Sequence, residues 1–115
     1  MSKVTIWHNP RCSKSREALK LIEEKGIQPN IFKYLNEEIT KEDIKNILNL
    51  TGLKAKDIIR TKEAIYKELN LKEVEDEELL IETMLKHHKL IERPIVITQD
   101  KAVLGRPPQK VLEII

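Results

Sequence analysis

The chain has 115 residues, of which 40% are hydrophobic and 35% charged, and its net charge is +2. This length suits one domain with one hydrophobic core, and the near-balance of charges argues against a disordered tail. Lysines and glutamates are interleaved along the chain, so a nucleic-acid partner is not indicated. No apolar run reaches the roughly 18–20 residues of a membrane span, and the first residues lack a signal-peptide core. We therefore expect a cytoplasmic protein without a membrane partner.

The first third of the chain has the pattern of a strand, a helix and a second strand. Val4–Trp7 is a β-branched and aromatic run that stops at the breakers His8-Asn9-Pro10. The following helix pattern is expected to be capped by Ser13 and to end at Gly26. Residues 31–35 form the next strand candidate. Two strands joined by a helix normally pair in parallel with a right-handed crossover.

Residues from about 36 to 90 favour helices, which predicts a helical insertion. Thr40 and Asp43 have the spacing of a capping box at the start of the first of these helices. The apolar periodicity predicts helices over residues 41–50, 54–59, 62–69 and 76–86.

The last part of the chain predicts a hairpin and a closing helix. Residues 94–98 are almost continuously apolar, as in a buried strand, and a polar turn leads into a second strand at 101–104. Gly105–Pro108 breaks this strand, and a final packing helix is expected over 109–114. We therefore predict one α/β domain over 1–115, with a four-stranded mixed sheet. Its order, β-α-β, helical insertion, β-β-α, is that of a thioredoxin-like fold.

Cys12 is the only cysteine, so it cannot form an internal disulfide or supply a four-cysteine zinc site. A lone cysteine is most often a small core residue. Cys12, however, comes directly before a predicted helix and lies among His8, Arg11, Lys14 and Arg16. The helix N-terminus and these basic groups favour the thiolate, and they also favour an oxyanion ligand. We expect a reactive thiol.

Four motifs in the same order resemble those of the glutaredoxin-linked arsenate reductase (ArsC) family. The resemblance extends over essentially the whole chain. The motifs are His-x3-Cys-x3-Arg at His8–Arg16, Asp57–Arg60 on the insertion, Arg93–Val96 before the third strand, and Leu104–Pro107.

The resemblance implies a role for each of these positions. Cys12 would attack arsenic, and His8 would help to hold the loop and the thiolate. Arg60, Arg93 and Arg106 would clamp the oxyanion, because a guanidinium binds such oxygens in pairs. Arg16 faces the same loop and is a further candidate for substrate binding. The resemblance also implies a cis peptide bond at Arg93-Pro94, and no metal or bound cofactor is expected.

A single cysteine cannot resolve its own adduct, so turnover would need external thiols. The resemblance names glutathione as the reductant and glutaredoxin as the partner of a monomeric enzyme that acts on arsenate. Two alternatives stay open. One is a reductase of another oxyanion. The other is a non-catalytic redox regulator, for example one that binds RNA polymerase, although Ser15 replaces the second cysteine of the Cys-x-x-Cys switch in such regulators.

Overall fold

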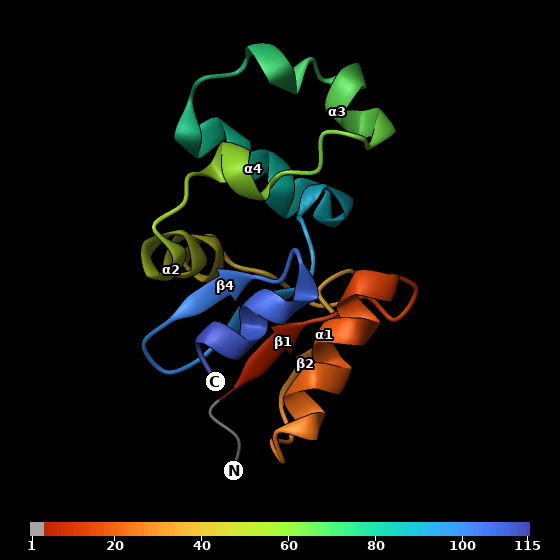
Figure 1. Ribbon diagram of the computed structural model, residues 1–115. Coiled ribbons are helices and arrows are strands. Elements are labelled where there is room, and N and C mark those ends of the chain that lie inside the picture. The colour runs from red at the N-terminus through yellow and green to blue at the C-terminus, as the bar shows by residue number, and fades with distance from the viewer. Residues whose placement is uncertain (1–3) are drawn as a thin grey trace. The chain divides into compact units, whose positions relative to one another are not determined.

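The computed structural model describes residues 4–115, which divide into two compact units (Figure 1). One unit comprises the segment up to Glu38 together with Arg93–Ile115, and the other is Ile39–Glu92. The second unit corresponds closely to the insertion expected over about 36–90, whereas the single-domain organisation stays a prediction. Within residues 4–115, no helix is long and apolar enough to cross a membrane.

The first unit contains a mixed sheet with the strand order β2-β1-β3-β4. Strand β1 pairs in parallel with β2 and antiparallel with β3, and β3 pairs antiparallel with β4. The strands are β1 (Thr5–Trp7), β2 (Asn30–Phe32), β3 (Ile95–Ile97) and β4 (Ala102–Leu104). The thioredoxin-like α/β fold expected from the element order is thereby confirmed.

One face of this sheet forms a core with two helices of the same unit. Ile6 on β1 and its partner Val96 on β3 are fully buried there. Ala18 and Ile22 fill the core from helix α1 (Ser13–Glu24), and Val111 fills it from the 3-10 helix Pro108–Glu113. The two helices lie side by side in Figure 1 and pack against each other.

The predicted elements of the first unit differ from the observed ones at their ends, and strands β1 and β4 each begin one residue later than expected. Strand β2 ends at Phe32 and not at residue 35, because the chain turns at Lys33, where Asn36 N–H donates to the Lys33 carbonyl over 2.9 Å. The strand predicted over 94–98 is Ile95–Ile97. The final helix is of the 3-10 type, and its first residue is Pro108. The turn after β2 places the buried Tyr34 against Trp7, with a ring separation of 6.3 Å.

The second unit is made of short helices. The capping box at Thr40 and Asp43 is confirmed, with both reciprocal hydrogen bonds present. The segment predicted over 62–69 is helical only at Ala64–Glu68, and 54–59 is a 3-10 helix at Ala55–Ile58. The α-helices of this unit are α2 (Lys41–Thr51), α3 (Ala64–Glu68) and α4 (Glu77–Lys86), and further 3-10 turns lie at Leu71–Glu73 and His88–Leu90.

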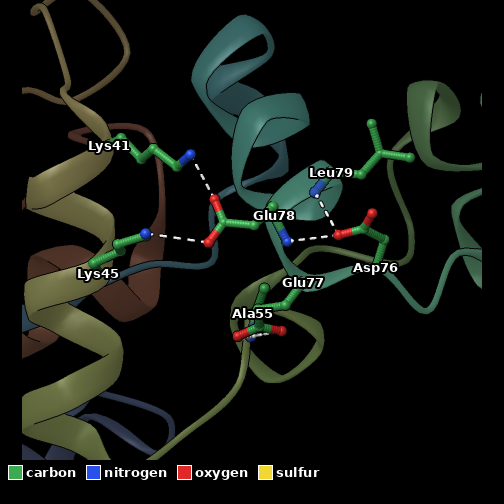
Figure 2. A network of polar contacts seen from close by, with 7 residues as sticks. All are labelled: Lys41, Lys45, Ala55, Asp76, Glu77, Glu78 and Leu79. Carbon is green, nitrogen blue, oxygen red and sulfur yellow. Dashed lines mark hydrogen bonds and ion pairs between the residues drawn. The ribbon is translucent and has the colours of Figure 1, made fainter.

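Polar contacts join the start of α4 to its neighbours within the second unit (Figure 2). The Glu78 carboxylate pairs with Lys41 and Lys45 of α2. Asp76 caps α4 by accepting from the backbone N–H of Glu78, and Glu77 accepts from the N–H of Ala55 at the start of the 3-10 helix. Ion pairs at this exposure contribute little stability, so the two backbone contacts matter more for the position of the helix.

Gly105 lies where β4, the segment at Pro94 and the last helix meet. Its N–H donates to the Pro94 carbonyl over 2.8 Å. A Cβ atom at this position would lie 2.9 Å from Pro94 Cγ and 3.2 Å from Val111 Cγ1. The first separation is too short for two carbon atoms, so only a glycine fits without movement of its neighbours.

Gly105→Ala is therefore expected to lower the free energy of unfolding by about 1–3 kcal/mol, the usual cost of overpacking a core. Urea denaturation followed by circular dichroism measures the change. An unaltered midpoint would contradict the expectation and would mean that the Pro94 ring moves aside freely.

Candidate active site

Cys12 is the N-cap residue of α1. It has an extended backbone, with φ −94° and ψ 122°, and its carbonyl accepts the first helical hydrogen bond from Arg16 N–H. The prediction that Ser13 caps the helix is wrong, because Ser13 already lies inside the first turn. The Cys12 N–H donates to the Asn9 carbonyl over 3.0 Å, in the turn that leads into the helix. Cys12 thus holds the N-cap position without a side-chain capping hydrogen bond.

The surroundings of the sulfur favour its ionised form. Burial raises the pKa of the Cys12 thiol, since the side chain is only 9% exposed. This effect is outweighed by hydrogen bonds from the backbone N–H of Ser15, from the Arg93 side chain and from the N–H of Lys14, together with the positive charge of Arg93. The net pKa of Cys12 is lowered. A thiolate is the nucleophilic form, so the expectation of a reactive thiol agrees with the geometry.

Arg93 and Arg106 flank the β3–β4 hairpin, at the end where β3 begins and β4 ends. Arg93 precedes β3, and its Nε and Nη1 atoms are buried. Arg106 follows β4, and its Nη1 donates to the Arg93 carbonyl over 3.0 Å. The peptide bond at Arg93-Pro94 is cis, as the resemblance implies, and the bond at Arg106-Pro107, which was not predicted, is cis as well. One guanidinium thus contacts the sulfur, and the second is tied to the backbone of the first.

Arg16 lies on α1 with an exposed side chain, and it braces the loop before Cys12. Its Nη1 donates to the Pro10 carbonyl over 2.9 Å. The same loop is held internally by a bond of 3.0 Å from Arg11 N–H to the Asn9 side chain. This geometry is that of a loop support, and a role of Arg16 in substrate binding stays a prediction.

His8 is buried and forms a hydrogen bond with Ser15, with 2.7 Å between Nδ1 and Oγ. Burial lowers the pKa of His8, and the positive charges of Lys33 and Arg16 lower it further. Ser15 is not among the site residues expected from the sequence. One signal was available: Ser15, Ala18 and Ile22 form one helical stripe, and a polar residue on a buried stripe needs a partner.

Arg60 belongs to the second unit, where two carboxylates hold its guanidinium. Arg60 N–H donates to the Leu90 carbonyl over 2.7 Å, which places the residue beside the segment ending at Glu92. Its Nη1 lies 3.0 Å from the Glu63 carboxylate, and its Nε lies 3.5 Å from that of Glu92. Neither glutamate is among the site residues expected from the sequence. Contact of Arg60 with an oxyanion stays a prediction.

The two adjacent histidines near the end of α4 have structural positions. His87 is the C-cap residue of this helix, and its N–H donates to the Thr83 carbonyl over 2.9 Å. His88 begins the next 3-10 turn. In the described part of the chain, residues 4–115, no group of three or more histidine, cysteine or acidic side chains could hold a metal ion.

The lowered pKa of Cys12 predicts a specific pH profile for its alkylation. The rate rises with pH as the thiolate forms, and its midpoint should lie below the ordinary thiol value of about 8.5. Arg93→Ala removes a hydrogen bond and a charge that favour the thiolate, so the midpoint should move to higher pH. Stopped-flow alkylation with iodoacetamide measures both proteins.

Arg11→Ala is the matched control, because Arg11 is exposed and, contrary to the expectation from the sequence, is not among the groups that lower the pKa of Cys12. Its midpoint should equal that of the unmodified protein. Equal midpoints for the Arg93 and Arg11 variants would contradict the assigned role of Arg93.

The chain matches the ArsC family over residues 7–114. It is 46% identical over 114 residues to an arsenate reductase of Haemophilus influenzae, covering 97% of this chain and 98% of that protein. It is also 46% identical to the uncharacterized protein YfgD of Escherichia coli, covering 98% and 97% of the two chains. The solved structure of an arsenate reductase from Vibrio cholerae superposes with a TM-score of 0.93 at 46% identity, covering 97% of each chain. On its sequence, its fold and its relatives, the chain belongs to the ArsC family.

Proposed function

We propose that this protein is a thiol-dependent arsenate reductase in which Cys12 is the nucleophile. The observation that carries the proposal is the position of the Cys12 sulfur at the start of α1, where two backbone N–H groups and Arg93 stabilise its thiolate. The same donors that favour a thiolate also favour an oxyanion placed beside it. The arsenate reductase of Haemophilus influenzae and that of Vibrio cholerae support arsenate as the substrate.

In the first step, the Cys12 thiolate attacks arsenic. A sulfur–arsenic bond forms, and one arsenic–oxygen bond breaks as a hydroxyl of arsenate takes up a proton and leaves as water. Arsenic keeps its oxidation state of +5. The negative charge that gathers on the remaining oxygens needs donors already in place, and the guanidinium of Arg93 is one of them.

Reduction requires two electrons, and external thiols supply them because the chain has a single cysteine. Glutathione adds its sulfur to arsenic, and a second water leaves. A glutaredoxin thiolate then attacks the glutathione sulfur, the electron pair of the broken sulfur–arsenic bond stays on arsenic, and a mixed disulfide is released. Water finally displaces the Cys12 sulfur from arsenic(III), so that arsenite leaves and the thiol is restored.

The arginines are assigned according to their contacts. Arg93 stabilises the thiolate and binds an oxygen of the substrate, and Arg106 adds a second guanidinium beside the Arg93 backbone. The family resemblance assigns Arg60 the same function, and Arg16 supports the loop. The enzyme is proposed to work as a cytoplasmic monomer without a resident cofactor. Another oxyanion substrate, or a regulator without turnover, is the alternative that the assays below distinguish.

Arsenate-dependent oxidation of NADPH, coupled through glutathione, glutaredoxin and glutathione reductase, is expected for the purified protein. Cys12→Ser should abolish it, since a hydroxyl at this position is not ionised at neutral pH. Retained activity in this variant would contradict the covalent step. A folded protein without activity, whose Cys12 still alkylates rapidly at neutral pH, would instead favour another oxyanion or a binding protein.

Arg106→Ala should raise the KM for arsenate by about tenfold to a hundredfold, the expected loss for one charged hydrogen bond. The alkylation midpoint of Cys12 should stay unchanged, because Arg106 does not contribute to its lowered pKa. Steady-state kinetics in the coupled assay measure the first effect, with Arg11→Ala as the control. The same measurement on Arg60→Ala tests the role that the resemblance implies for Arg60. An unaltered KM in either variant would show that the substituted arginine does not bind arsenate.

A further inference from the structure

Ser15 is a buried polar residue on the face of α1 that points into the first unit. It is 0% exposed, and its hydroxyl oxygen lies 2.7 Å from His8 Nδ1 and 3.0 Å from the backbone nitrogen of Asn9. His8 is itself only 6% exposed. A buried hydroxyl and a buried imidazole must satisfy each other, because neither has ready access to water.

The two contacts of the Ser15 hydroxyl favour one placement of the protons. The Asn9 N–H can only donate, so the Ser15 oxygen accepts from it. The hydroxyl proton of Ser15 is then directed to His8 Nδ1, the other partner at hydrogen-bond distance. Nδ1 can accept a proton only in a neutral imidazole, whose own proton is on Nε2.

A protonated His8 would not fit the same contacts. Its Nδ1–H would donate to the Ser15 oxygen, which can accept from both His8 and Asn9, but the Ser15 hydroxyl proton could then no longer point at Nδ1. The buried hydroxyl proton of Ser15 would lose its acceptor, which is costly inside a protein. The charged groups that act on His8 are Lys33, in the turn after β2, and Arg16 on α1, and both disfavour a second positive charge.

We infer that Ser15 is a positioning residue that keeps His8 neutral, with its proton on Nε2, and fastens the Cys12 loop to α1. The inference changes the role expected for His8. His8 contributes shape and a directed N–H group to the loop, while the positive charge at the thiolate comes from Arg93. The kinetic consequence rests on the proposed function, whereas the protonation state can be measured without any substrate.

Nitrogen-15 NMR of histidine-labelled protein, in long-range proton–nitrogen spectra between about pH 5 and 8, tests the inference. The three histidines give separate signals, and His8→Gln assigns the one of interest. His8 of the unmodified protein should show the Nε2–H form at neutral pH and titrate below the ordinary value of 6.5. A signal of the Nδ1–H form, or of a charged imidazole at pH 7, would overturn the inference.

Substitutions at the two serines on α1 distinguish the effect of the Ser15 hydroxyl from a general effect of changing the helix. Ser15→Ala removes the bond that favours the neutral imidazole, so the titration of His8 should move upward by about half a pH unit or more, with both neutral forms present. Ser15→Thr keeps a hydroxyl and should restore the original spectrum. Ser13→Ala, at an exposed position in the same turn, should leave it unchanged.

An unshifted His8 in Ser15→Ala would overturn the inference. If Ser15→Ala does not fold, the protonation state of His8 in the unmodified protein still tests the inference, because that measurement needs no substitution. If the unmodified protein shows no arsenate turnover while His8 is in the Nε2–H form, the proposed function is rejected and the inference about Ser15 stands.

Discussion

The place of Cys12 at the N-terminus of α1 is the constraint on which the candidate active site depends. A helix leaves its first N–H groups without partners inside the helix, and those of Lys14 and Ser15 lower the pKa of the Cys12 thiol. They can do so only if the chain between Trp7 and Cys12 follows one path. The bonds of Asn9 and Pro10 hold that path, and the packing of α1 against the last helix holds its end. The lowered pKa of the Cys12 thiol therefore depends on the packing of the whole unit.

The parallel pairing of the first two strands and the closing hairpin could be predicted, because they follow from apolar runs and from the connections between them. The Cys12 loop could also be predicted, since breakers followed by a helix start have a clear pattern in the sequence. The exact ends of the helices and strands could not be predicted. Ser13 is a better capping residue than cysteine by propensity, yet Cys12 holds the N-cap position.

The partners of the site residues were harder to predict than the residues themselves. Ser15 acts through His8, seven positions away, across a turn of chain whose path depends on tertiary packing. Glu63 and Glu92 reach Arg60 because a short antiparallel pairing of Ile59 with Ile91 brings distant segments together. Such pairings depend on long-range contacts that no local pattern records. The two arginines consequently differ in electrostatics: Arg93 faces a sulfur, whereas the charge of Arg60 is offset by carboxylates.

The aromatic stack beside β1 gives the protein an internal optical probe. Trp7 is the single tryptophan of the chain, it is 4% exposed, and it directly precedes His8. Its indole lies against Tyr34 and, with a ring separation of 5.1 Å, against Phe32. All of the tryptophan fluorescence therefore arises one residue from the loop that carries the thiol, and a movement of that loop would change the emission without any attached dye.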